Sequence, residues 1–398
     1  MRTLLTALLL TGAALAAPLT ITPPTQEVQP GALVILTASE LSNWATSAGT
    51  LGSAQGTRIV LEAPKTPGPV TVTVTDPKDA SRRAFAVVTV KAPVASSAIW
   101  KPSTIAAGFQ FSAAVGTDGK LWVWGNNEQK VLPGLSAKVI PTPTQVDSIT
   151  QVQSVAASPR TRGEGSMVAV IAADDTAWFW GGGTPNPVAR SSQAEAAQLR
   201  GCTSIMQKDG SVMGAYDKLK VNNIAYLNGS WDSSNPVNAV IDQNGNLFVS
   251  KGYCSPDFKQ VANLKNVVAA EGMDSGIFVA ATVDGRGFIA KNWQFNPLAG
   301  LTDIYRMTTA GKFGFIVKKD GSLHQFSLDK NENPSIPAQV KGMSDIVDVS
   351  ISGGHVLALR RDGTLFAMGN NQYGQLGNGA TQNSNSFVPV VGLKVKVP

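Results

Sequence analysis

Residues 360–379 read RRDGTLFAMGNNQYGQLGNG, and this stretch can be interpreted in two ways that lead to different folds. Its Asp362-Gly363 pair lies between two apolar runs, which is typical of a tight β-hairpin turn. The later glycines form either one loop that holds a phosphate or one copy of a repeated unit. No helical pattern follows Gly379, so the helix N-terminus that a phosphate loop needs is missing. The second interpretation predicts further copies in the chain.

Comparable two-residue turn signals recur about 35 to 56 residues apart, which is the spacing of one small supersecondary unit each. The seven signals are Asp118-Gly119, Asp174-Asp175, Asp209-Gly210, Asn244-Gly245, Asp284-Gly285, Asp320-Gly321 and Asp362-Gly363. The residues three and four positions before every turn are apolar. Four positions after the turns stand Trp122, Trp178, Met213, Phe248, Phe288, His324 and Phe366. The pattern predicts seven four-stranded units that form a closed seven-bladed β-propeller over residues 103–398.

The last copy, SGGHVLALRRDGTLFAMGNNQYGQLGNG, resembles the repeat of the regulator of chromosome condensation family. The matching residues are Gly369, Asn371, Gly374, Gln375, Leu376, Gly377 and Gly379, while Met368 stands where the family usually has Trp. The first copy keeps Trp124, Gly125 and Asn127, and the middle copies keep little beyond strand, turn and strand. The resemblance implies the same seven-bladed propeller, with His355 in a turn-stabilising role.

The first sixteen residues, MRTLLTALLLTGAALA, are typical of a secretory signal peptide. They combine a positive charge at Arg2, a short apolar run and small residues before Ala17. The apolar run is shorter than the roughly 20 residues of a membrane-spanning helix. The sequence therefore predicts an exported protein, secreted or held at the bacterial cell envelope, without a membrane span.

Residues 17–92 consist of short alternating runs of β-branched residues divided by Pro and Gly turns. The pattern VxPGxxVxLTA over Val28–Ala38, a lone Trp44, and the later APxxPG and VTVT segments resemble bacterial immunoglobulin-like domains. We expect a β-sandwich of that kind, with Trp44 in its core rather than in a binding site. Residues 93–102 are predicted to be a linker.

Charge and cysteine content narrow the function further. Without Arg2 the chain has 32 basic and 27 acidic side chains, and the basic ones are scattered, so no nucleic acid partner is expected. Cys202 and Cys254 are the only cysteines. In an exported chain they form one disulfide or remain two unpaired buried thiols, and their spacing does not fit a zinc or redox motif.

The sequence contains no convincing catalytic, cofactor or metal motif. His324 and His355 lie far apart without neighbouring cysteine or carboxylate motifs, and His324 occupies a position where we expect a packed side chain. Neither a nucleophile elbow nor a nucleotide-binding loop is present. Glu164, Glu271 and Asp274 are expected in loops between strands, where they could pair as in a polysaccharide hydrolase or lyase. We keep that alternative and expect a non-enzymatic protein without a cofactor.

In a propeller of this kind the hairpin turns lie on one face, and the loops between first and second and between third and fourth strands lie on the other. Exposed aromatic and basic side chains on variable loops are typical anchors of protein interfaces. The candidate partner-binding residues are Phe109, Arg160, Arg162, Asp274, Trp293, Lys312 and Tyr373, with Asn127 and Phe295 beside them. Each of them could instead pack within its own blade.

We therefore expect an exported, monomeric, non-catalytic binding protein whose partner is another protein or a surface glycan. Secreted bacterial propellers with these repeats include an inhibitor of β-lactamases, so an inhibitor of a secreted enzyme is one alternative. A polysaccharide hydrolase or lyase is the other, because fold alone does not fix function. We also expect residues Leu393–Val397 to close the ring by pairing with blade one near residues 99–107.

Overall fold

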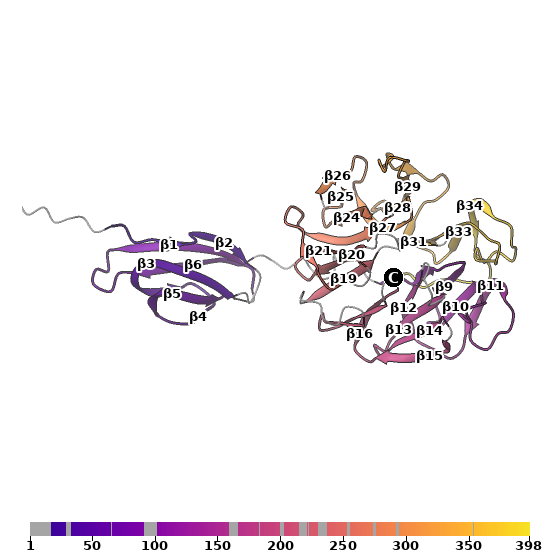
Figure 1. Cartoon of the computed structure of the whole chain (residues 1–398), viewed down its shortest axis with the longest axis horizontal. Coiled ribbons are helices and arrows are strands. Elements are labelled where there is room, and N and C mark those ends of the chain that lie inside the picture. The colour runs from indigo at the N-terminus through magenta and orange to yellow at the C-terminus, as the bar shows by residue number, and fades with distance from the viewer. Residues whose placement is uncertain are drawn as a thin grey trace, which may run out of the picture. The chain divides into compact units, whose positions relative to one another are not determined.

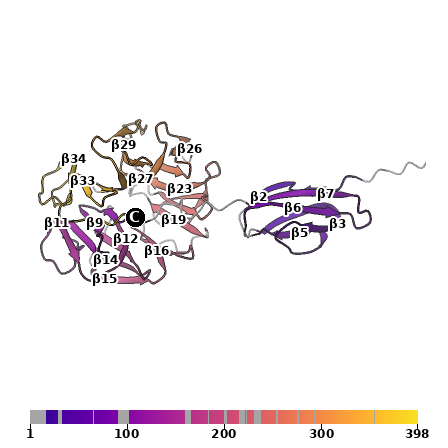
Figure 2. The same ribbon diagram turned by 180° about the vertical axis from the view of Figure 1, so that it is seen from behind.

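Every regular element that the structure describes is a β-strand, as the alternating apolar patterns predict. In this computed structural model the strands form two units, Met1–Pro93 and Val94–Pro398 (Figures 1 and 2). The described residues are 17–28, 33–64, 66–90, 102–158, 166–182, 184–199, 203–214, 221, 223–229, 237–252, 255–273, 276–291, 294–352 and 354–398. The predicted signal peptide and most of the predicted linker lie outside them. No described helix could cross a membrane.

The N-terminal unit is an all-β unit with the strand order β2-β7-β6-β3-β5-β4 and β1 paired with β3. Its strands are β1 (Ile21–Thr22), β2 (Thr25–Val28), β3 (Leu33–Thr46), β4 (Thr50–Leu51), β5 (Gln55–Glu62), β6 (Gly68–Thr75) and β7 (Arg83–Val90). Trp44 is 5% exposed and its indole N–H donates to the Gly56 carbonyl at 2.8 Å. The prediction that Trp44 is a core residue is confirmed, whereas the immunoglobulin-like assignment stays a prediction.

Seven further sheets follow one another along the chain and form the ring seen in Figure 1. Blades one and two consist of β8 (Ile105–Ala107), β9 (Phe111–Val115), β10 (Leu121–Asn126) and β11 (Val139–Val146), then β12 (Val152–Ala157), β13 (Met167–Ala172), β14 (Ala177–Gly181) and β15 (Thr184–Ser191). Blades three and four consist of β16 (Ala194–Gln198), β17 (Ser204–Gln207) and β18 (Val212–Gly214), then β19 (Ile224–Gly229), β20 (Val237–Asp242), β21 (Leu247–Lys251) and β22 (Lys259–Gln260).

Blades five to seven continue the same pattern of consecutive antiparallel strands. They consist of β23 (Val267–Gly272), β24 (Phe278–Thr282), β25 (Gly287–Lys291) and β26 (Gln294–Pro297), then β27 (Ile304–Ala310), β28 (Phe313–Lys318), β29 (Leu323–Ser327) and β30 (Ala338–Gln339), then β31 (Ile346–Ser352), β32 (His355–Arg360), β33 (Leu365–Gly369) and β34 (Ser384–Pro389). Six blades have four strands, and the described part of blade three has three. The predicted seven-bladed β-propeller is confirmed.

All seven predicted turns connect the second strand of a blade to the third. The second turn residue always has a positive φ, from 65° at Asp175 to 85° at Gly285, which glycine adopts without strain. Hydrogen bonds from the Ser211 hydroxyl and backbone N–H lower the pKa of the first turn residue Asp209. The apolar residues three and four positions before every turn are buried. Of the large residues after the turns, only Met213 is exposed, at 43%, and the others are buried or half-buried.

Each turn also binds the next blade through its backbone. The carbonyl of the second turn residue accepts the N–H of the residue that begins the next inner strand, as Gly321 accepts from Ile346 at 2.9 Å. The seven donors are Val152, Ala194, Ile224, Val267, Ile304, Ile346 and Val395. Six of them begin the next blade, whereas Val395 lies at the C-terminus and donates to Gly363 at 2.9 Å.

Val395 therefore stands where the inner strand of blade one should begin. It pairs with Gly116, which follows β9, just as Val152 pairs with Ala172 at the end of β13 in blade two. The Thr104 hydroxyl donates to the Lys396 carbonyl at 2.6 Å, next to the point where β8 begins. The inner strand of blade one is thus divided between the two ends of the propeller sequence, and the C-terminus lies near the middle of the ring (Figure 1).

The predicted closure by the C-terminal segment is confirmed, but its predicted pairing partner is wrong. Val395 pairs with Gly116 rather than with residues 99–107. The reason is that Ile105–Ala107 already forms part of the inner strand, paired with β9. The C-terminal segment extends that strand instead of lying beside it.

The glycine-rich stretch that follows β33 folds into a loop that supports the neighbouring blade. Asn371 is fully buried, and its side-chain oxygen accepts the N–H of Leu376 at 2.9 Å. The folded loop presents the Gln375 carbonyl to the indole N–H of Trp124 in blade one, at 2.9 Å. A side chain at Gly377 would meet the same indole ring, since an added Cβ would lie 2.6 Å from its nitrogen. This loop is used for packing between blades.

His355 also joins blade seven to blade one. Its ring is fully buried and Nε2 lies 2.8 Å from the hydroxyl oxygen of Ser112. That hydroxyl donates its single hydrogen to the Gln375 carbonyl at 2.8 Å, so the neutral imidazole donates through Nε2. Burial lowers the pKa of His355 to about 4. The contact through Nε2 gives His355 a structural role between blades seven and one.

Candidate functional site

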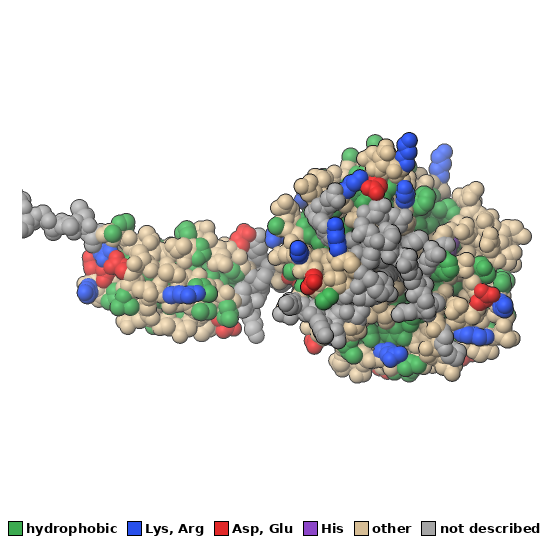
Figure 3. All heavy atoms as spheres, in the orientation of Figure 1, with side chains coloured by type: hydrophobic (Ala, Val, Ile, Leu, Met, Phe, Trp, Pro, Cys, Tyr) green, Lys and Arg blue, Asp and Glu red, His purple; other side chains and the backbone are tan. Residues whose placement is uncertain are grey.

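The two faces of the propeller differ in how variable they are. We call the face with the seven hairpin turns the turn face, and the face with the loops between first and second and between third and fourth strands the loop face. On the loop face, β27 and β28 are joined only by Gly311 and Lys312, whereas residues 370–383 join β33 to β34. On the side shown in Figure 3 the described Lys and Arg side chains stand apart from one another and form no dense basic patch.

Three of the predicted partner-binding residues can be placed on the loop face. Lys312 is exposed, whereas Phe109 and Tyr373 are half-buried. The backbone N–H of Phe109 donates to the Ser158 carbonyl at 2.9 Å, so Phe109 helps to join blades one and two. The remaining candidates and the possible disulfide lie outside the described residues and stay predictions: Arg160, Arg162, Asp274, Trp293, Cys202 and Cys254.

Two neighbouring candidates pack within the propeller. Asn127 is 2% exposed and its side-chain oxygen accepts the N–H of Leu132 at 2.8 Å, which fixes the β10–β11 loop as Asn371 fixes the loop of blade seven. Phe295 is half-buried against the core between blades four and five. Local packing therefore accounts for both residues.

Blade six exposes an apolar surface that the sequence analysis did not identify. Phe313, directly after Lys312, is 58% exposed, and Ile336 in the β29–β30 loop is 76% exposed. Phe313 pairs with Ser327, and the Ser327 carbonyl accepts the N–H of Ser335 at 2.8 Å, so that loop leaves and returns beside the hairpin. Ile336 lies on the side of blade five, since a Cβ added at Gly300 would be 3.5 Å from its Cγ2, so it is separate from Phe313. We call Lys312 and Phe313 the blade-six patch. A Phe directly after a two-residue Gly-Lys turn is the sequence signal that could have revealed it.

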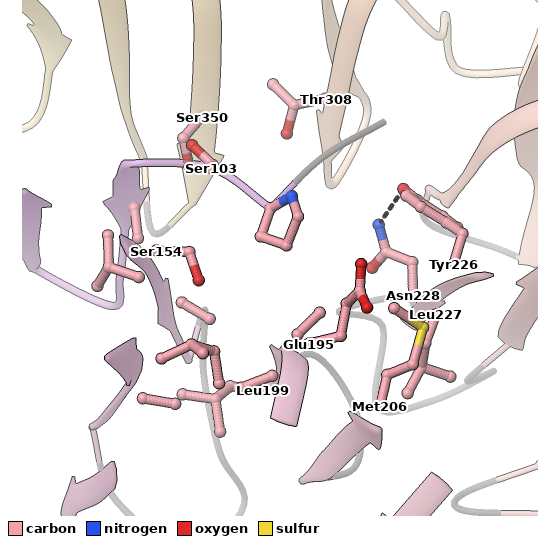
Figure 4. A pocket seen from close by; sticks show the side chains of 18 of the residues that line it. Ser103, Ser154, Glu195, Leu199, Met206, Tyr226, Leu227, Asn228, Thr308 and Ser350 are labelled. Atoms are coloured by element: carbon pink, nitrogen blue, oxygen red, sulfur yellow. Dashed lines mark hydrogen bonds between the residues drawn. The ribbon is translucent and has the colours of Figure 1, made fainter. Parts of the chain in front are cut away.

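A cavity of about 660 Å³ lies at the centre of the ring (Figure 4). Residues of all seven inner strands line it. On blades one to three the lining is mostly small and apolar, with Ala106, Ala156 and Ala197 as examples, whereas on blades four to seven it is mostly polar. The polar lining residues of those blades are Tyr226, Asn228, Gln243, Glu271, Arg306, Thr308, Asp348 and Ser350. Gln243 and Lys208 belong to hairpin turns, so one end of the cavity reaches the turn face.

The position of Glu271 contradicts the expectation that this carboxylate lies in a loop between strands. It lies in β23 and not in a loop, because Val267–Gly272 pairs continuously with β24 after a bulge near its start. The side chain is 7% exposed, and its carboxylate accepts the backbone N–H of Thr309 at 2.8 Å. Its two expected partners in a catalytic pair, Glu164 and Asp274, lie outside the described residues.

Asp348 is the most deeply buried acid of the cavity wall. It is 3% exposed and accepts hydrogen bonds from the Val349 N–H, at 2.9 Å, and from the Ser103 hydroxyl. Burial raises the pKa of Asp348, and the positive charge of Arg306 on the adjacent inner strand opposes this rise. At the turn-face end the Lys208 ammonium lies 2.6 Å from the Asp175 carboxylate. Acidic and basic groups thus alternate around the cavity.

The described residues contain no group of three or more His, Cys, Asp or Glu side chains that could hold a metal ion. His324 is half-buried, with Nε2 3.0 Å from the Ser322 hydroxyl, and burial lowers its pKa. Its contacts are those of a packed side chain, as expected from its position after the turn.

Comparisons with known protein families identify a repeat in the first and last blades. Family models of the regulator of chromosome condensation (RCC1) repeat match residues 103–129 and 346–375, and residues 362–396. The solved structure of yeast RCC1 (Prp20) bound to Kap60 is 15% identical over 72% of this chain and 74% of that chain, with a TM-score of 0.42. Human WBSCR16 is 13% identical over 74% and 83%, with a TM-score of 0.40.

A third similar structure is PorZ, a surface component of the type-IX secretion system of Porphyromonas gingivalis. It is 15% identical over 74% of this chain and 39% of that chain, with a TM-score of 0.47. The sheet order gives the fold, and the matched segments lie in blades one and seven, on either side of the ring closure. The second unit of this chain is a seven-bladed β-propeller whose first and last blades match the repeat of the regulator of chromosome condensation family.

Proposed function

We propose that this chain is an exported, non-catalytic binding protein that holds a protein partner on the loop face of its propeller. The observation that carries the proposal is the blade-six patch, in which Phe313 is 58% exposed directly after the exposed cation Lys312. Large apolar side chains on a rigid scaffold, rimmed by polar groups, are the usual anchors of protein interfaces. Propellers built from these repeats are a protein-binding fold, which supports the same conclusion.

The fold itself does not require Phe313 to be a phenylalanine. Two residues along the same strand, Phe315 is 3% exposed and belongs to the core between blades six and seven. The β27–β28 hairpin is already held by backbone pairing, in which Phe313 pairs with Ala310 and with Ser327. An apolar ring at an exposed and backbone-stabilised position is better explained by a partner than by packing.

Capture of partners from the culture supernatant and envelope fraction tests this proposal. The wild-type chain should retain a partner in a fixed ratio, and a Phe313→Ala variant should lose it. A Val283→Ala/Tyr305→Ala variant is the matched control, since these residues are 45% and 46% exposed and lie near the turn face. Retention of the same partner by the loop-face variant, or its loss from the turn-face variant, would contradict the assignment of the face.

The same experiment separates the alternatives. If the captured partner is a secreted enzyme and its activity falls when this chain is added, the protein is an inhibitor. Release of soluble sugar from cell-wall or capsular polymer by the purified chain would overturn the non-catalytic part of the proposal. Export is tested by the mass of the mature chain, which should begin at Ala17 if the signal peptide is removed there.

A further inference from the structure

The central cavity lies apart from the proposed protein-binding surface. It reaches the turn face at Lys208 and Gln243, whereas the blade-six patch lies on the loop face. A cavity of about 660 Å³ is of the size that holds a small molecule, since such sites usually measure about 300–1,000 Å³. Its occupant would therefore be a small ligand and not the folded partner proposed above.

The lining divides into two halves of different chemistry. Ala106, Ala107, Ala156 and Ala157 on blades one and two, and Leu199 on blade three, give an apolar wall of mostly small side chains. The opposite wall has amide, hydroxyl, carboxyl and guanidinium groups on four consecutive blades. Figure 4 shows side chains from both halves around one space, with Ser154 and Leu199 on one side and Thr308 and Tyr226 on the other. A ligand that fits must have an apolar face and a polar edge.

The charges of the lining decide between ligand classes. Three acidic residues, Glu195, Glu271 and Asp348, stand with two basic residues, Arg306 and Lys208, and Lys208 is paired with Asp175. The buried carboxylates are already held within the wall, Glu271 by the Thr309 N–H and Asp348 by the Val349 N–H and the nearby charge of Arg306. A charged ligand would be buried without a counter-ion of its own, which is unfavourable. The mixture of signs favours an uncharged ligand.

A hydroxyl group satisfies both kinds of wall residue, because it donates one hydrogen bond to a carboxylate and accepts others from a guanidinium or an amide. The rigid strands hold these wall groups in place, as the Asn228 amide is held by a hydrogen bond to the Tyr226 hydroxyl at 3.1 Å (Figure 4). We propose that the cavity binds a neutral saccharide of one or two rings, with its hydroxyls toward blades four to seven and its C–H face against the alanines of blades one and two.

Titration calorimetry on the whole chain tests the ligand class. The probes are glucose, galactose, N-acetylglucosamine, maltose and cellobiose, with glucosamine and glucose 6-phosphate as cationic and anionic counterparts. At least one neutral sugar should bind, at least tenfold more tightly than its charged counterparts. Binding of only the charged sugars, or of none of the probes at millimolar concentration, would overturn the proposal.

Two variants test the place of binding. Ala156→Leu fills part of the cavity without removing a polar group, and Thr308→Val removes one hydroxyl of the polar wall at nearly constant volume. Both should weaken the affinity for the sugar at least tenfold, while Phe313→Ala on the loop face should leave that affinity unchanged.

If a variant does not fold, hydrogen exchange of the wild-type chain tests the site instead. The bound sugar should then protect Ile304–Ala310 and Ile346–Ser352, and protection confined to the loop face would contradict the site. If Phe313→Ala loses the protein partner but still binds the sugar, the protein-binding surface and the sugar site are independent, so either proposal can fail without the other.

Discussion

On the turn face every blade repeats the same backbone hydrogen bonds, whereas on the loop face the connections differ in length and in what they expose. The turn of blade six, for instance, accepts the N–H of Ile346 through the Gly321 carbonyl, and its six counterparts do the same for the blades that follow them. The loop face of that blade exposes Phe313 instead. The difference indicates that closure of the ring constrains the turn face and leaves the loop face free to vary.

The largest effect on stability is expected at Val395, where the last of the repeated turn-face hydrogen bonds is made by the C-terminal segment. Val395 is fully buried and donates to Gly363 in the position that an inner strand occupies in the other blades. Val395→Asp would bury a carboxylate without a compensating charge, so we expect the propeller to lose about 3–5 kcal/mol of stability. Denaturant unfolding followed by tryptophan fluorescence measures this loss. Val397→Asp, at a position 38% exposed, is the matched control and should cost under about 0.5 kcal/mol. Equal effects of the two substitutions would show that the ring does not depend on Val395.

The second prediction concerns pH and the contact between blades seven and one. The folded pKa of His355 is about 4 against an ordinary value of 6.5, so the unfolded chain binds the extra proton between these values. The propeller should therefore lose stability as pH falls from about 6.5 to about 4, by roughly 3 kcal/mol in all. His355→Gln keeps a donor near Ser112 but does not titrate, so its stability should depend less on pH in this window. Buried Asp348, whose pKa is raised, contributes with the opposite sign in both proteins and cancels in the comparison. Parallel pH profiles of the two proteins would rule out His355 as the cause.

The sequence predicted the turn face far better than the loop face, and the reason is physical. A residue with positive φ, such as Gly363 at 81°, leaves a mark in the sequence because few residues tolerate that conformation. The buried positions before the turns are marked by the alternation of strands. Exposure of Phe313 is marked only by its place directly after the two-residue Gly311-Lys312 turn, and a phenylalanine in a strand is usually buried. The polar wall of the cavity escaped prediction because its members, such as Asn228 and Thr308, come together only when seven separate strands meet.

A third prediction separates the strain of the turn conformation from crowding between the last turn and the C-terminal segment. Gly363→Ala should cost about 1–2 kcal/mol, because φ is 81° and the new Cβ would lie 2.9 Å from the Val395 carbonyl oxygen. Gly392→Ala shares a positive φ of 69° but meets nothing within 4 Å, so it should cost about 1 kcal/mol or less. Thermal unfolding of the two variants separates backbone strain from crowding at the closure. If Gly363→Ala is no worse than Gly392→Ala, the contact with Val395 adds nothing.

The smallest effect on stability is expected on the loop face. There the proposed function predicts a large effect on partner binding instead. Phe313→Ala should change the stability of the propeller by less than about 0.5 kcal/mol, because the side chain is 58% exposed. Phe315→Ala, two residues further along β28 and 3% exposed, should cost about 3–4 kcal/mol by leaving a cavity between blades six and seven. If Phe313→Ala is as destabilising as Phe315→Ala, Phe313 is needed for folding, and the blade-six patch is not a binding surface. If Phe313→Ala leaves stability unchanged and the variant also fails to capture the partner, Phe313 serves binding rather than folding. The loop face would then bind the partner, while the turn face holds the blades together.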